Sequence, residues 1–178
     1  SFVFDFVDAA GNTGSTTATV NWIDTTAPTA TITYSTTGAT NQNVIATLTG
    51  ASESITVTNN TGTTYTFSAN GSFTFDFVDA AGNTGSATAT VANIDTTTPT
   101  AIVEYSPSVT TSGAVVATLT GASESITITN NSGSNTYTFN ASGSFVFDFV
   151  DAAGNTGSTT ATVNWIDTTA PVVTLVGS

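Results

Sequence analysis

The feature that most constrains the fold of this chain is a segment that occurs three times. Residues 1–15, which read SFVFDFVDAAGNTGS, recur almost unchanged at 72–86 and at 144–158, at offsets of 71 and 72 residues. A period of this size indicates a small domain copied in tandem, because the units of solenoid proteins are shorter. We therefore expect a row of similar domains, as in a protein that spans distance or displays surface.

Within each repeat, apolar residues alternate with polar ones along short segments. Phe73, Phe75 and Phe77, for example, alternate with Thr74 and Asp76. A period of two indicates a strand with one buried face, and threonine suits the outward positions because its β-branched side chain favours strands. Six such segments are expected in residues 24–94, at 29–34, 44–49, 55–58, 65–67, 73–78 and 89–91, and the same pattern recurs in residues 95–166.

Six short strands with one apolar face each are expected to pack as two sheets. The predicted fold class is therefore all-β, with tandem immunoglobulin-like β-sandwiches of about 71 residues in a rod-like array. The predicted organisation is the C-terminal hairpin of a truncated repeat (1–23), two complete repeats (24–94 and 95–166) and the first strand of a following repeat (167–178). On this interpretation the chain is an excerpt of a longer protein.

Composition excludes several classes of function. The chain has no Lys, Arg, His or Cys, and its twelve Asp and Glu residues give a formal charge of −12. Without cationic side chains nucleic acid is not an expected partner, and no apolar run approaches the ~20 residues that a membrane-spanning helix needs. An enzyme is not expected either, because no His, Lys or Cys could activate a Ser or Thr nucleophile.

The acidic residues are placed where they could converge. In the immunoglobulin strand order, the start of the first strand and two of the loops lie at the same pole of the sandwich. The candidate metal ligands are the polar residues of these three stretches, which are Asp24, Glu53, Asp79 and Asn83 in one repeat and Asp95, Glu124, Asp151 and Asn155 in the next.

Three carboxylates in a chain without cations repel one another, and a hard divalent cation would remove that repulsion. Ca²⁺ fits best, because it takes about six to eight oxygen ligands in irregular geometry, whereas Mg²⁺ retains its waters and Zn²⁺ prefers His or Cys. The alternative is that these are ordinary turn residues, with Gly82 at a positive φ in a tight hairpin. Asp76 and Asp148 are interpreted as solvated.

Several of these segments resemble a known family. The loop DAAGNTG at 79–85, the segment TATV at 88–91 and the junction DTTTP at 95–99 are similar to bacterial Ig-like repeats, which occur in tandem in large prokaryotic surface proteins and adhesins. The junctions DTTAP at 24–28 and 167–171 match the family pattern more closely. The resemblance implies an extracellular location at a prokaryotic cell surface and a role as a spacer or adhesive stalk, often stiffened by calcium.

The predicted function is therefore a non-catalytic extracellular spacer whose partners are the neighbouring repeats of the same chain. One alternative is a subunit of a filament or surface layer, in which neighbouring protomers complete the sandwich by strand addition. Another is a glycan-binding adhesive module.

Two tryptophans leave a further alternative open. Trp22 and Trp165 lie two residues before their junctions, where the middle junction has Asn93. Each could contact the following repeat or cap its own sandwich.

Overall fold

The computed structural model describes residues 1–174 and confirms the all-β fold class. Among these residues the only helix is one 3₁₀ turn, η1 (Asn131–Gly133). The chain divides into two compact units. One comprises Ser1–Tyr34, Ile45–Tyr65 and Ser72–Thr90, and the other comprises Ser35–Val44, Thr66–Gly71 and the described residues from Val91 onward.

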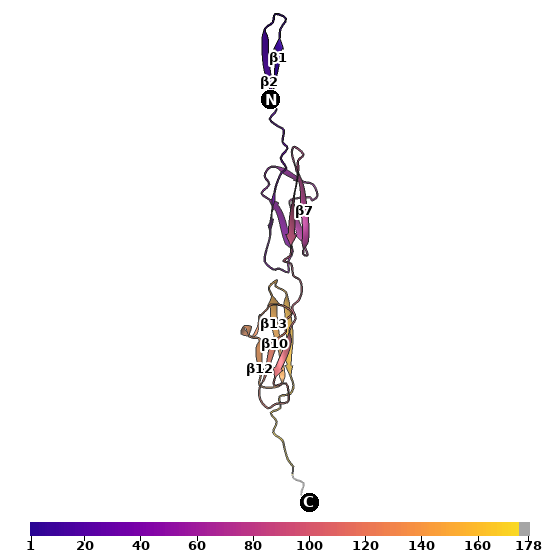
Figure 1. Ribbon diagram of the computed structural model, residues 1–178. Coiled ribbons are helices and arrows are strands. Elements are labelled where there is room, and N and C mark those ends of the chain that lie inside the picture. The colour runs from indigo at the N-terminus through magenta and orange to yellow at the C-terminus, as the bar shows by residue number, and fades with distance from the viewer. Residues whose placement is uncertain (175–178) are drawn as a thin grey trace. The chain divides into compact units, whose positions relative to one another are not determined.

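The first strands form an isolated hairpin. β1 (Phe2–Val7) pairs antiparallel with β2 (Thr13–Ala18), as Figure 1 shows. The pairing runs from Phe2 opposite Ala18 to Val7 opposite Thr13.

Residues 24–94 contain six strands in two sheets. They are β3 (Thr31–Tyr34), β4 (Val44–Thr49), β5 (Ile55–Val57), β6 (Thr64–Phe67), β7 (Gly71–Asp79) and β8 (Thr84–Val91). The strand orders are β3-β4-β6 and β5-β7-β8. These orders correspond to the A-B-E and C-F-G strands of an immunoglobulin-like sandwich, and bends occupy the place of a D strand.

Residues 95–166 repeat this arrangement. Their strands are β9 (Ile102–Ser106), β10 (Val115–Thr120), β11 (Ile126–Ile128), β12 (Thr136–Phe139), β13 (Gly143–Asp151) and β14 (Thr156–Val163). The sheets have the orders β12-β10-β9 and β11-β13-β14, and all their strand pairs are antiparallel. The repeat is one residue longer than residues 24–94, and the extra residue falls between β11 and β12, where η1 lies.

The two sheets of residues 95–166 share one core, because the alternating pattern turns the apolar residues of both sheets inward. The buried members are Val115, Ala117, Leu119, Phe139, Phe147, Phe149, Ala161 and Val163. At the edge of this core Tyr137 stacks on Phe145, with ring centroids 3.9 Å apart, and Phe145 meets Phe147 edge to face at 5.0 Å. Such aromatic pairs add to the free energy gained by burial.

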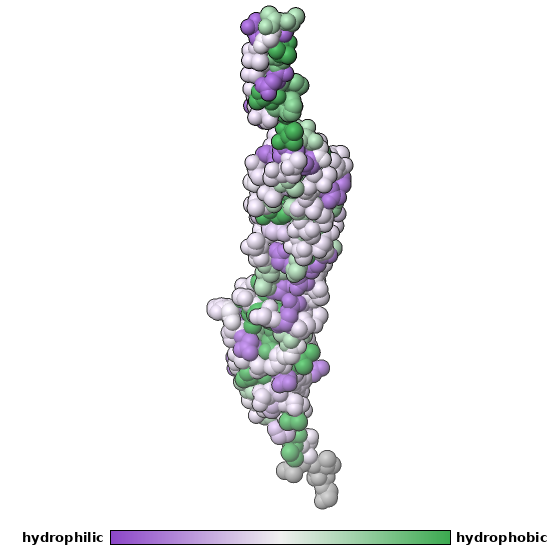
Figure 2. Space-filling view, turned by 45° about the horizontal axis from the view of Figure 1, so that its top comes forward, coloured by the Kyte–Doolittle hydropathy of each residue, from purple (hydrophilic) through white to green (hydrophobic). Residues whose placement is uncertain are grey.

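The hairpin β1–β2 has the same sequence as β13 and β14, but no second sheet of the described residues packs on its apolar face. Residues 1–28 are identical to residues 144–171, so Phe4 and Phe6 are equivalent to Phe147 and Phe149. Phe4 is 52% exposed and Phe6 59%, whereas their equivalents are 0% and 1% exposed. Figure 2 shows this apolar surface on the hairpin.

A backbone clamp holds the end of the last strand of each complete repeat. The N–H of Thr40 donates to the carbonyl of Asn93 (3.0 Å), and the N–H of Asp95 donates to the carbonyl of Thr40 (2.9 Å). Thr111 makes the equivalent bonds to Trp165 and Asp167 (3.1 and 2.9 Å).

The structure places Trp165 in its own repeat. Its Nε1 donates to the carbonyl of Pro107 (3.2 Å), and its ring meets Tyr105 edge to face at 5.2 Å. Asn93 has the same role in the preceding repeat, where its Nδ2 donates to the carbonyl of Gly38 (2.7 Å). Trp22, which follows the isolated hairpin, is 74% exposed. For Trp165, capping is therefore the role that the structure favours.

The predicted strand at 167–178 has no strand pairing in residues 167–174, and its last four residues lie outside the described range. No helix within the described residues combines the length and apolar character needed to cross a membrane.

Candidate metal centre

The loop between β7 and β8 is built around the carboxylate of Asp79. Its Oδ1 accepts hydrogen bonds from the N–H groups of Ala81 and Asn83 (2.8 Å each), and its Oδ2 accepts one from Nδ2 of Asn83 (2.8 Å). Gly82 has a φ of 94°, a backbone conformation that glycine adopts without strain. These bonds allow Asp79 to remain only 7% exposed.

The same loop forms twice more. Asp151 accepts the equivalent hydrogen bonds from Ala153 and Asn155, and Asp8 accepts them in the isolated hairpin, at distances of 2.8 to 2.9 Å. Because the loop forms in the hairpin without a neighbouring acidic residue, its conformation alone is explained as a tight turn. The loop aspartate alone therefore does not indicate a metal site, and the other two carboxylates of each cluster are needed to do so.

The glutamate of each cluster lies on the loop that follows the second strand of the repeat. The preceding residue ties this loop to the start of the repeat, since the N–H of Ser52 donates to the carbonyl of Thr29 (2.9 Å) and the N–H of Thr29 donates to Oγ of Ser52 (3.0 Å). Ser123 and Thr100 make the same pair of bonds at 2.8 and 3.0 Å. The bonds fix the loop, so Glu53 is held toward Asp79.

The junction aspartate completes each cluster. The carbonyl of Asp24 accepts a hydrogen bond from Nδ2 of Asn83 (3.3 Å), and the carbonyl of Asp95 accepts one from Nδ2 of Asn155 (2.9 Å). The loop asparagine thus binds both the loop aspartate and the junction backbone.

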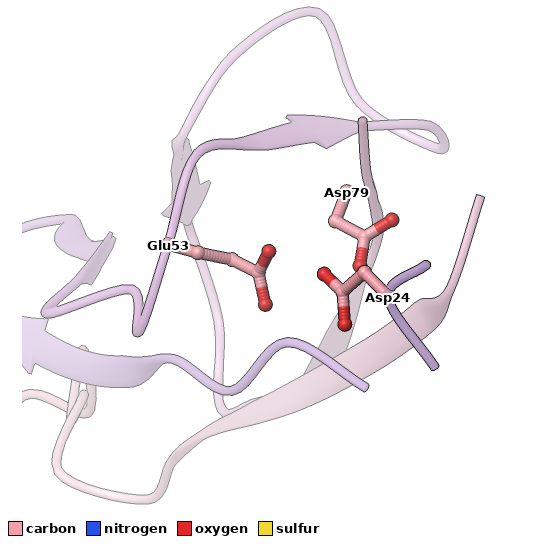
Figure 3. Close-up of side chains that lie close together, drawn as sticks. All are labelled: Asp24, Glu53 and Asp79. Carbon is pink, nitrogen blue, oxygen red and sulfur yellow. The ribbon is translucent and has the colours of Figure 1, made fainter. Parts of the chain in front are cut away.

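Three carboxylates meet in each complete repeat. Asp24, Glu53 and Asp79 each present an oxygen within 4.8 Å of the others. Figure 3 shows the three side chains lying close together. Asp95, Glu124 and Asp151 form the second cluster within the same limit. All six predicted acidic residues are therefore at the predicted positions, three to a cluster.

The two predicted amide ligands are placed differently. The Nδ2 of Asn83 faces the carboxylate of Asp79 and the carbonyl of Asp24, and Asn155 is placed in the same way. An amide nitrogen is a donor, so in this arrangement the Nδ2 of each asparagine orients two acidic residues. A ligand role for the Oδ1 of either asparagine stays a prediction.

The clusters are electrostatically strained. Burial raises the pKa of Glu53 above its ordinary value of 4.5, and the charges of Asp24 and Asp79 raise it further. Burial, Asp151 and Asp95 do the same to the pKa of Glu124. Burial also acts to raise the pKa of Asp79, but the hydrogen bonds from Asn83, Ala81 and Gly82 outweigh it and hold this pKa below 3.8.

The polar residues that position the clusters have no recognisable signal in the sequence. Ser52 and Ser123 act through a reciprocal bond to a residue 23 positions away, which no local pattern reveals. Asp76, interpreted as solvated, is exposed but accepts a hydrogen bond from Nδ2 of Asn59 (2.9 Å), and Asp148 accepts one from Asn130 (3.0 Å).

No protein-family model matches this chain, and no characterised protein sequence matches it significantly. One solved structure is similar, described by the words "Structural insight into host cell surface retention of a 1.5-MDa bacterial ice-binding adhesin". The two share 23% sequence identity with a TM-score of 0.42, over 89% of this chain and 70% of the other.

Proposed function

We propose that this chain is a non-catalytic structural segment of an extracellular bacterial surface protein of the adhesin type, and that its complete repeats bind Ca²⁺ at their acidic clusters. In this role each repeat adds one sandwich to a spacer. The similar adhesin structure gives the proposal its context.

One observation carries the calcium proposal. In both complete repeats three carboxylates from three separate stretches converge within 4.8 Å, although the chain has no Lys, Arg or His to neutralise them. The described residues donate no hydrogen bond to the carboxylate of Glu53 or Glu124, and the pKa of each is raised. A cation would relieve this repulsion.

The donor set favours Ca²⁺. All three side chains offer hard oxygen atoms, and a carboxylate such as that of Asp79 keeps acceptor capacity beyond its hydrogen bonds. A bound Ca²⁺ would draw together the junction, the glutamate loop and the β7–β8 loop. It would therefore stabilise the folded repeat, by ~2.7 kcal/mol per site at a free concentration of about 100 Kd.

The test is a thermal melt of the chain with Ca²⁺ and with a chelator, together with calorimetric titration of Ca²⁺. We expect a higher midpoint with Ca²⁺ and two ions bound per chain. Glu53→Gln should leave one site and Glu53→Gln/Glu124→Gln none, while the control Asp148→Asn, which removes a carboxylate outside the clusters, should leave two. An unchanged midpoint and no heat of binding would contradict the calcium proposal.

The exposed face of β1–β2 favours a second candidate function, assembly by completion of a sandwich. The equivalent face at Phe147 and Phe149 is covered by the other strands of its repeat, so strands of this same kind are its fitting partner. Light scattering over a series of protein concentrations tests this. The molar mass of the particles should grow with concentration if the chain assembles, and it should stay constant if the chain is a monomeric spacer.

In residues 24–166 no aromatic side chain is exposed, so no observation there favours a glycan site.

A further inference from the structure

The sequence contains one Asn-Gly pair, Asn70-Gly71. Asn70 is exposed and ends the turn between β6 and β7, and Gly71 is the first residue of β7. The pair therefore lies at the end of a strand, where backbone hydrogen bonds open most readily.

The side chain of Asn70 holds the backbone of Ile94 at two points. Its Nδ2 donates to the carbonyl of Ile94 (2.8 Å), and its Oδ1 accepts from the N–H of Ile94 (2.8 Å). Ile94 lies between the two bonds of the Thr40 clamp and directly precedes Asp95. Asn70 thus holds the chain where it enters the junction.

The next repeat performs the same task with a different residue. Oγ of Ser142 donates to the carbonyl of Ile166 (3.2 Å) and accepts from its N–H (3.3 Å). Serine has no carboxamide. Of the two side chains that bind this backbone position, only that of Asn70 can therefore be converted to an acid.

We propose that Asn70 is a site of spontaneous deamidation that weakens this junction. The backbone nitrogen of Gly71 attacks Cγ of Asn70, and ammonia leaves as a five-membered succinimide ring closes. Water then opens the ring at one of its two carbonyl groups, giving aspartate or a β-linked isoaspartate. The net reaction consumes one water and releases one ammonia, with no change in oxidation state.

The surroundings of Gly71 permit this attack. Glycine has no side chain to shield its nitrogen, and apart from Gly71 itself and its two chain neighbours no heavy atom lies within 4 Å of the position that a Cβ would occupy. Glycine also reaches strained backbone conformations at low cost. Every other asparagine in the chain is followed by a residue with a side chain.

The product cannot make both bonds to Ile94. A carboxylate has no hydrogen to donate to the carbonyl of Ile94, and it places a negative charge against that carbonyl oxygen. The isoaspartate form also lengthens the backbone by one atom at the start of β7. Both products therefore lower the stability of the folded chain.

The experiment incubates the complete chain at mildly alkaline pH and follows the conversion of amide to acid by peptide mapping and ammonia release. We expect conversion at Asn70 before any other asparagine. Gly71→Ala, which has room for its methyl group, should slow the reaction severalfold. Asn70→Ser should abolish the reaction, and its hydroxyl should bind the backbone of Ile94 as Ser142 binds that of Ile166.

Asn70→Asp, which reproduces one product, should lower the unfolding midpoint by about 4–8 °C, the shift expected for loss of one hydrogen bond, while Asn70→Ser should not. The proposed site is wrong if Asn70 stays unmodified in the folded chain but reacts when the chain is unfolded in denaturant. It is also wrong if another asparagine of the folded chain reacts first. An unchanged midpoint in Asn70→Asp would overturn the proposed weakening.

Discussion

Thr49 and Thr120 occupy equivalent positions at the ends of β4 and β10, but their hydroxyl groups differ in their partners. Oγ1 of Thr49 lies 3.3 Å from Oγ1 of Thr31 on the neighbouring strand. In the next repeat Ile102 replaces Thr31, and Oγ1 of Thr120 is buried without a hydrogen bond. A buried hydroxyl without a partner destabilises the folded state.

We therefore expect Thr120→Val to raise the free energy of unfolding by about 1 kcal/mol, because it removes this hydroxyl at nearly constant volume. Thr49→Val should lower the free energy of unfolding by up to about 1 kcal/mol, because it breaks an existing pair. Denaturant unfolding of the two variants measures both. The same sign for both substitutions would contradict the assignment.

The raised pKa of Glu53 and Glu124 predicts how stability depends on pH. A group whose pKa is higher in the folded state stabilises that state most below its unfolded pKa, here 4.5, and this contribution is lost as pH rises through the folded pKa. With chelator, the melting midpoint should therefore fall as pH rises from 4.5 towards neutrality. With Ca²⁺ it should rise over the same range, because the ion binds the ionised carboxylates.

The variant Glu53→Gln/Glu124→Gln separates this effect from the general repulsion of a chain with a charge of −12. It should flatten the dependence with chelator and abolish the rise with Ca²⁺. Asp79 and Asp151 act in the opposite direction at lower pH: their stabilisation is present above 3.8 and is lost as pH falls through their lowered pKa. An unaltered slope in the double variant would show that the clusters do not titrate as described.

At the scale of strands, a tyrosine joins the two sheets of each complete repeat. Oη of Tyr34 accepts the N–H of Thr90 (3.0 Å), and Oη of Tyr105 accepts the N–H of Thr162 (3.0 Å). In each case the tyrosine ends or nearly ends the first strand of one sheet, and the N–H belongs to the edge of the other sheet. The hydroxyl therefore covers an open position on that edge.

Tyr105→Phe should remove this bond while keeping the ring against Trp165. We expect faster hydrogen exchange at the amide of Thr162 and a loss of about 1 kcal/mol in the free energy of unfolding. The amide of Thr90, which Tyr34 still protects, is the control within the same molecule. Equal exchange at Thr162 in the variant and the parent would show that the bond does not protect this edge.

Much of the element-level structure could be predicted from the sequence, because alternation of apolar and polar residues determines which face of a strand is buried. Phe75 and Phe77 are buried as the pattern predicts. The tyrosine bond could not be predicted, since a tyrosine in an alternating pattern indicates a half-buried ring and does not identify the donor for its hydroxyl.

The acidic clusters could also be predicted, because the strand order alone brings three stretches to one pole. The hydrogen bonds that Asn83 donates to Asp24 and Asp79 could not be predicted, since a ligand and an orienting donor are the same residue type in the same loop.

For the whole chain, the exposed hairpin β1–β2 predicts that the binding of a hydrophobic dye can be separated from the effect of Ca²⁺ on stability. Removal of residues 1–23 should reduce the binding of a hydrophobic dye, because Phe4 and Phe6 contribute exposed apolar surface. The shift of the melting midpoint with Ca²⁺ should be retained, since both clusters lie in residues 24–151. Dye fluorescence and melts of the shortened chain check the two statements, and undiminished dye binding would mean that the apolar surface lies elsewhere.

The loop that contains η1 is the position at which a repeat tolerates an inserted residue. At the junction, Asp95 donates its N–H to Thr40 and accepts from Asn155 through its carbonyl, so an added residue there would break one of the two bonds. The difference in length between the two complete repeats falls instead at residues 131–135, between β11 and β12, outside the three stretches that supply the acidic residues. A foreign peptide grafted into that loop should therefore be displayed without disturbing either the sandwich or its neighbours.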